Sequence, residues 1–175
     1  MTTRAQVLFS GAATALLGGP LLAQFAAAAE AADAGDIGIL NAALELERAG
    51  IKAYDDAAAT GLLSKDVAAV AMGFKADHQA HRDALIGAIR SGGGTPSQKT
   101  AVLEYPALKS QTDILHFAKT VEEKAAVTYL SVVSEFKDRK LAEVAASILG
   151  VETTHVALLA SVLGELPAYK SGFVS

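Results

Sequence analysis

The residue types that could do chemistry in this chain are glutamate and histidine, and they occur in two copies of one pattern. Each copy has a glutamate, a tyrosine seven residues later and, 30 or 31 residues after the glutamate, two ionisable side chains at positions i and i+3, the second a histidine. The first copy consists of Glu47, Tyr54, His78 and His81, and the second of Glu122, Tyr129, Glu152 and His155. Glutamate and histidine together suit iron, manganese or zinc. The candidate metal ligands are therefore Glu47, His78, His81, Glu122, Glu152 and His155.

Each of these six side chains falls on an apolar stripe with steps of three and four residues, the spacing of one face of an α-helix. In the last stripe, Leu141, Ala145 and Ile148 precede Glu152 and His155. Capping residues, beginning with Asp36, and glycine stops predict four helices, over residues 36–60, 64–91, 110–136 and 138–164. Side chains three or four residues apart on a helix reach a common point, so each pair can serve one site.

The connections between the predicted helices indicate how they pack. Short links join the first helix to the second and the third to the fourth, and short links make antiparallel neighbours. The middle link is long and contains Pro96 and Pro106. Two antiparallel hairpins joined by one long crossover is the arrangement of ferritin-like folds. We therefore expect an all-α four-helix bundle over residues 30–175, with internal two-fold symmetry and a short C-terminal tail.

Carboxylates on a buried stripe are costly unless they are paired, protonated or bound to metal. In one interpretation, three carboxylates and three imidazoles satisfy one another as hydrogen-bonded pairs, and the cluster has only a structural role. In the other, the six groups bind metal, as in di-iron bundles, which take a glutamate from each of two helices and a Glu-x-x-His pair from each of the other two. The pattern leaves both interpretations open.

Three segments resemble bacterial exported ferritin-like domain proteins, namely Leu40–Glu47, Asp77–Leu85 and Ile148–His155. The resemblance covers the four predicted helices. It implies a ferritin-like bundle with metal ligands at Glu47, His81, Glu122, Glu152 and His155. At position 78 the family pattern has a glutamate that bridges two metals, whereas this chain has a histidine, which could be a terminal ligand beside His81. The expected cofactor is iron, with manganese or zinc as alternatives, as one or two ions.

Some residues near the stripes are expected to have ordinary roles. Asp77 is off the stripe and could replace the missing glutamate only if its helix rotated. His116 is expected at the surface. Tyr54 and Tyr129 could hydrogen-bond a ligand carboxylate or carry redox chemistry, but packing in the core, two turns from the site, is the simpler expectation.

The first 29 residues differ from the rest of the chain. The segment Met1–Arg4 carries one positive charge, residues 5–29 carry none, and small residues precede Glu30. This pattern is typical of a cleaved export signal, by the Sec or the twin-arginine route, and predicts a periplasmic or otherwise exported protein. An uncleaved membrane anchor is the second interpretation and an apolar helix packed on the domain the third. Contact with a membrane is expected only if the segment is uncleaved.

Composition excludes several classes of protein. The chain has no cysteine, which excludes disulfide scaffolds, thiol enzymes and cysteine-held clusters. Hydrophobic residues make up 51% and charged residues 19%, which argues against intrinsic disorder. The net charge is −4 and no run of lysine or arginine occurs, so no nucleic-acid partner is expected.

Three functions are compatible with these patterns. The first is an exported ferritin-like protein that oxidises or sequesters iron or manganese, in which case any enzymatic activity is ferroxidase-like or that of a di-metal oxidase. The second is a zinc or single-metal protein with no redox role, and the third is a structural or stress-related bundle with a degenerate site. The pair Glu152 and His155 favours the first two, and His78 favours the last two. Metal ions are the expected partners, and a homo-oligomer is left open.

Overall fold

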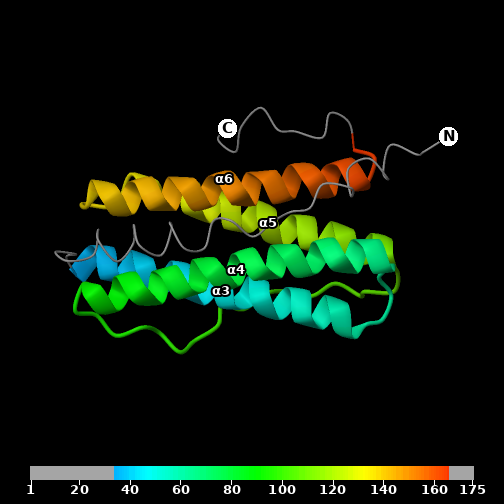
Figure 1. Cartoon of the computed structure of the whole chain (residues 1–175), viewed down its shortest axis with the longest axis horizontal. Helices are drawn as coiled ribbons and strands as arrows, with labels where there is room; N and C mark the ends of the chain where they lie inside the picture. Colours follow the sequence, from blue (N-terminus) through cyan, green and yellow to red (C-terminus); the bar gives the residue numbers. More distant parts are fainter. Residues whose placement is uncertain (1–33, 166–175) are drawn as a thin grey trace.

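The computed structural model describes residues 34–165, which form four helices and their connections (Figure 1). The helices are α3 (Ala34–Ala59), α4 (Lys65–Ser91), α5 (Gln111–Val133) and α6 (Arg139–Val162). The predicted export signal, residues 1–29, and residues 166–175 of the tail lie outside the described residues.

Local chemistry sets the ends of most helices where the sequence predicts them. Ser64, Ser110 and Asp138 have extended backbones, and each side chain accepts a backbone N–H from the first turn of the helix that follows. Gly164 follows α6 with φ of 75°, a left-handed conformation that glycine adopts without a steric penalty. The three N-caps confirm the predicted starts of α4, α5 and α6.

Two predicted details are wrong. Asp36 is not the cap of the first helix, because α3 already includes Ala34. The Asp36 carboxylate instead accepts the backbone N–H groups of Lys137 at 2.9 Å and Asp138 at 3.0 Å, and so joins the start of α3 to the turn before α6. The apolar stripe predicts that the third helix includes Phe136, but α5 ends at Val133 and the buried Phe136 lies in the connection to α6.

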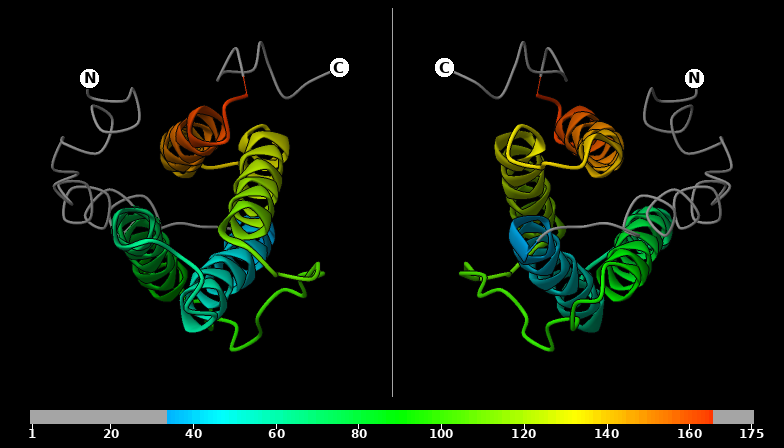
Figure 2. Two further views of the ribbon diagram at one scale, coloured as in Figure 1. Left: turned by 90° about the vertical axis from the view of Figure 1, so that its right-hand side faces the viewer. Right: turned by 90° about the vertical axis from the view of Figure 1, so that its left-hand side faces the viewer.

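The four helices form two hairpins that dock through α3 and α5. Helix α3 packs against α4, α5 packs against α6, and α3 also contacts α5. Seen along the bundle, the order around the axis is α4, α3, α5 and α6 (Figure 2). The connection between α4 and α5 runs the length of the bundle, so that α5 is antiparallel to both α3 and α6 (Figure 1). This confirms the predicted all-α four-helix bundle with one long crossover.

The crossover is tied to α3 by polar contacts. Asn41 donates to the carbonyl of Thr95 at 3.2 Å and accepts the backbone N–H of Ser97 at 2.7 Å. The Ser97 hydroxyl donates to the Glu45 carboxylate at 2.5 Å, and the backbone N–H of Ala101 donates to the Glu45 carbonyl at 3.0 Å. The outer face of α3 therefore holds the loop, which leaves its inner face for the core.

The apolar core is divided into clusters that leave the middle of the bundle to polar groups. One cluster includes Leu40, Leu44, Leu85, Leu141 and Ile148, and another includes Tyr54, Phe74, Leu115, Ala118 and Leu159. By length and composition α6 is the one helix among residues 34–165 that qualifies as a membrane span, but a core helix of a bundle meets the same criteria. Its buried face carries Glu152 and His155, which belong to the polar region between the clusters.

Candidate metal centre

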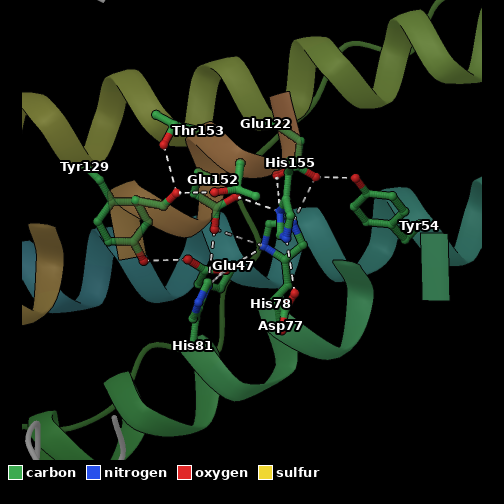
Figure 3. Close-up of polar contacts among 12 residues, drawn as sticks. Glu47, Tyr54, Asp77, His78, His81, Glu122, Tyr129, Glu152, Thr153 and His155 are labelled. Carbon is green, nitrogen blue, oxygen red and sulfur yellow. Dashed lines mark hydrogen bonds and ion pairs between the residues drawn. The ribbon is translucent and has the colours of Figure 1, made fainter. Parts of the chain in front are cut away.

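The six predicted ligands lie together in this polar region, and every helix contributes at least one (Figure 3). Each of the six residues is at most 3% exposed. Their helices are α3 for Glu47, α4 for His78 and His81, α5 for Glu122, and α6 for Glu152 and His155. The stripes of the four helices therefore converge on one buried cluster.

Within the cluster, two sets of four side chains could each hold a metal ion. The first donor group contains Glu47, His78, His81 and Glu152, and the second donor group contains His78, Glu122, Glu152 and His155. In each group, one ligand atom from every residue lies within 4.8 Å of the others. His78 and Glu152 belong to both groups. The arrangement is that of two adjacent cation sites that share two residues.

Contacts in the first donor group join α3, α4 and α6. His78 Nδ1 lies 2.7 Å from Glu47 Oε2. His81 Nδ1 lies 3.2 Å from Glu152 Oε1 and 3.6 Å from Glu47 Oε2. Two imidazoles therefore face two carboxylates across the bundle.

The second donor group repeats this arrangement on the other hairpin. His78 Nε2 lies 3.3 Å from Glu122 Oε1, so the two ring nitrogens of His78 face different donor groups. His155 Nδ1 lies 3.2 Å from Glu122 Oε2 and 3.5 Å from Glu152 Oε2. Glu152 thus presents one oxygen to each group.

Some of the buried atoms that could coordinate a metal ion lack a hydrogen bond. Among the described residues, neither oxygen of Glu152 nor Nδ1 of His81 has a partner in hydrogen-bonding geometry. Glu152 is fully buried, and an unsatisfied buried carboxylate is costly. A cation coordinated by these atoms would remove that cost, so the donor set fits a metal ion.

Two tyrosines connect the halves of the cluster. The Tyr54 hydroxyl of α3 donates to Glu122 Oε1 of α5. The Tyr129 hydroxyl of α5 donates to Glu47 Oε1 of α3 at 2.5 Å. The expectation that both rings only pack in the core is wrong, because each hydroxyl binds a candidate ligand of the opposite hairpin. The two contacts follow the two-fold repeat in the sequence.

His155 is held by two further residues of α4. Its Nε2 lies 3.1 Å from Asp77 Oδ2, and Phe74 stacks on its ring with the centroids 3.9 Å apart. Asp77 belongs to neither donor group, so it contacts His155 but does not take the place of the glutamate that the family pattern has at position 78. A carboxylate on the outer nitrogen of a histidine orients the inner nitrogen toward a metal. The sequence pattern did not predict this pair, because Asp77 lies off the apolar stripe and the matching position of the second repeat is Val151.

Burial and mutual charge set the protonation of the metal-free cluster. Burial opposes ionisation of Glu47, but the positive charge of His81 and a hydrogen bond to His78 outweigh it and lower the pKa of Glu47 to about 2. Burial likewise opposes protonation of His81, yet the charge of Glu47 raises the pKa of His81 to about 9. For Glu152 burial prevails and raises its pKa. Protons on the imidazoles thus balance the carboxylates, and a metal ion must displace them.

The family of the chain follows from its match to known domains. The model of the ferritin-like domain family matches residues 35–165, which include all four helices and all six clustered side chains. The chain belongs to the ferritin-like domain family. This ferritin-like protein contains a buried glutamate and histidine cluster whose two donor groups could each hold a metal ion.

Two solved structures resemble the ferritin-like bundle described here. One is described as ferritin like, diiron-carboxylate proteins from Bacillus anthracis str. Ames, with 22% identity, a TM-score of 0.64, and coverage of 73% of this chain and 94% of that chain. The other is a conserved hypothetical protein from Mycobacterium tuberculosis, with 23% identity, a TM-score of 0.68, and coverage of 79% and 96%. At these identities the likeness shows the fold alone. A search of curated proteins finds no match.

Proposed function

We propose that this ferritin-like protein is exported and binds one or two metal ions in the buried cluster, where it oxidises or sequesters iron or manganese. The observation that carries the proposal is Glu152. Its carboxylate is fully buried between the two donor groups, and neither oxygen has a hydrogen bond within residues 34–165. His81 Nδ1 and His155 Nδ1 lie 3.2 Å and 3.5 Å from these oxygens, but not in hydrogen-bonding geometry, whereas buried polar groups in folded proteins are nearly always hydrogen-bonded.

The chain's own residues assign distinct roles at the two sites. Glu47 and His81 would hold an ion in the first donor group, and Glu122 and His155 an ion in the second, with Glu152 between them. Three carboxylates offset only three of the four charges of two divalent ions, so we expect unequal occupancy and the tighter binding at Glu152 and His155. Iron or manganese bound there would supply one-electron redox chemistry, which zinc would not.

A second candidate function is structural, and the contacts of His78 favour it. Each nitrogen of this ring already faces a carboxylate, Glu47 Oε2 at 2.7 Å and Glu122 Oε1 at 3.3 Å. Histidine replaces the glutamate that would bridge two metals in the family pattern. In this alternative the cluster is a set of ion pairs that fixes the packing of the hairpins, or it holds a single zinc ion.

Thermal unfolding with and without metal distinguishes the two functions. The metal-free protein is titrated with iron(II), manganese(II) and zinc(II), and a metal analysis of protein from its native compartment identifies the physiological ion. Ligand linkage predicts a gain of about 2.7 kcal/mol at a hundredfold excess over the dissociation constant. If the folded protein gains no stability with any of the three metals, the structural function stands and metal binding is refuted.

Export is supported by the uncharged residues 5–29 and by the small residues before Glu30. N-terminal sequencing of secreted or periplasmic material should start near Glu30. Recovery of an intact Met1 in a cytoplasmic fraction would contradict both the cleavage and the location.

A further inference from the structure

A glycine lies beside the cluster of glutamate and histidine side chains, in the interior of a helix, where glycine is unfavourable. Gly50 is buried in the interior of α3, one turn after Glu47. Apart from proline, glycine is the least favourable residue in a helix interior. Two other helical glycines, Gly38 in α3 and Gly73 in α4, have open space where a side chain would be. Gly50 differs from both because the imidazole of His78 occupies that space.

The fit between Gly50 and the His78 ring is close. A Cβ atom at position 50 would lie 2.9 Å from Cε1 and 3.0 Å from both Nδ1 and Nε2 of His78. Real Cβ atoms essentially never come this near to another heavy atom, so any side chain at position 50 would push the ring away. The Tyr54 ring, one turn further along α3, lies near the same imidazole with the centroids 5.7 Å apart. Gly50 and Tyr54 thus define a slot on α3 for the His78 ring.

The position of the ring in this slot determines which atoms it reaches. From there Nδ1 contacts Glu47 of the first donor group at 2.7 Å, and Nε2 contacts Glu122 of the second at 3.3 Å (Figure 3). The ring is buried, with 2% of the residue exposed. A displacement of the ring away from α3 would lengthen its contact with Glu47, which is on the same helix as Gly50, and would change its contact with Glu122 of α5.

We propose that Gly50 is a positioning residue for the cluster, and that its missing side chain lets the imidazole of His78 serve both donor groups. His78 is then an integral part of the site, because α3 has a glycine where a side chain would displace the His78 ring. The steric part of this proposal depends only on the fold, and the expected effect on metal affinity rests on the proposed function.

The first test replaces Gly50 by alanine and measures metal affinity by calorimetry on the full chain. We expect a loss of about 10–100-fold, the usual effect of disturbing the groups that orient metal ligands. Nitrogen-15 spectra of the metal-free variant should show altered shifts for both ring nitrogens of His78. The matched control is Gly38→Ala on the same helix, which should leave affinity and spectra unchanged and keep or raise the Tm, because alanine favours helix and nothing lies within 4 Å.

A double-mutant cycle then separates the contact with His78 from a general packing defect. Gly50→Ala should lower the Tm of the metal-free protein, yet it should raise the Tm when introduced into His78→Ala, where no ring opposes the added methyl group. Equal Tm changes in both backgrounds, failure of the double variant to fold, or unchanged metal affinity in a folded Gly50→Ala would overturn the proposal. If the unaltered protein binds no metal, the proposed function fails, while the Tm cycle and the spectra still decide the role of Gly50.

Discussion

Replacement of Glu152 by glutamine should abolish metal binding while changing the stability of the metal-free protein little. The glutamine amide keeps the volume of the side chain and removes a buried charge whose oxygens have no hydrogen bond among the described residues. Burial already raises the pKa of Glu152, so the charged form is disfavoured in the folded protein. Loss of this carboxylate also removes one of the negative charges that raise the pKa values of His78 and His81, so an imidazole gives up its proton more readily in the variant.

The size of the change in the free energy of unfolding distinguishes a metal site from a structural cluster. For the metal-free Glu152→Gln variant we expect a free energy of unfolding within about 1 kcal/mol of the unaltered protein, since the partial loss of ionic contacts is offset by the removal of a buried charge. If the cluster exists to pair its charges, breaking it should cost about 3–5 kcal/mol. At a hundredfold metal excess the unaltered protein should gain about 2.7 kcal/mol, or roughly 5–11 °C in Tm, and the variant nothing.

Differential scanning calorimetry at pH 7, with and without metal, measures both quantities in one series. Glu143→Gln is the matched control, because Glu143 is an exposed residue of the same helix. This control removes an equal charge and should keep the full metal-dependent gain. A metal-free Glu152→Gln variant that loses 3–5 kcal/mol, together with no metal effect in the unaltered protein, would refute the reasoning.

Three further predictions concern the same cluster. His78→Glu should raise the number of metal ions bound per chain, measured by metal analysis after dialysis, because it adds a second carboxylate between the donor groups; an unchanged number would contradict the bridging role. Tyr129→Phe should lower the free energy of unfolding of the metal-free protein in urea by about 1.5–3 kcal/mol through loss of a hydrogen bond to a charged acceptor, and a change near zero would show that the bond contributes nothing. The metal-free protein should be most stable between pH 4.5 and 6.5. His81 stabilises it fully below its ordinary pKa of 6.5 and loses this effect as the pH rises to about 9, and Glu47 stabilises it above 4.5 and loses this effect as the pH falls to about 2. The metal-dependent gain in Tm should instead increase as the pH rises toward about 9, where the His81 imidazole deprotonates in the folded protein, and a pH-independent gain would count against direct imidazole ligation.

The fold could be predicted because its information is local and periodic. Steps of three and four residues place Glu152 and His155 on the same face as Ile148, and a helix buries the face that carries its apolar residues. Ser110 and Asp138 mark helix starts through hydrogen bonds to the next turn, which depend on neighbouring residues only. The same periodicity predicted the cluster of six side chains, whereas their ligation of metal stays a prediction.

The contacts that the sequence did not reveal depend on how one helix sits against another. Asp77 reaches His155 from the edge of its stripe, and an edge position contacts either solvent or the next helix according to the rotation of α4. Gly50 is informative only once the His78 ring is seen against it. The carboxylate of Asp36 binds backbone groups about 100 residues away, and no local pattern encodes that approach.

The hydrogen bonds of the two tyrosine hydroxyls across the hairpins have a consequence for the symmetry of the site. Neither hairpin can satisfy its own network, because the acceptor for Tyr54 is Glu122 and the acceptor for Tyr129 is Glu47. Two identical hairpins that pair about a two-fold axis would make the same reciprocal bonds. Such a symmetric dimer could never place histidine at one of the matching positions and glutamate at the other, as residues 78 and 152 do. Because one chain carries both halves, the two cation positions can be chemically different.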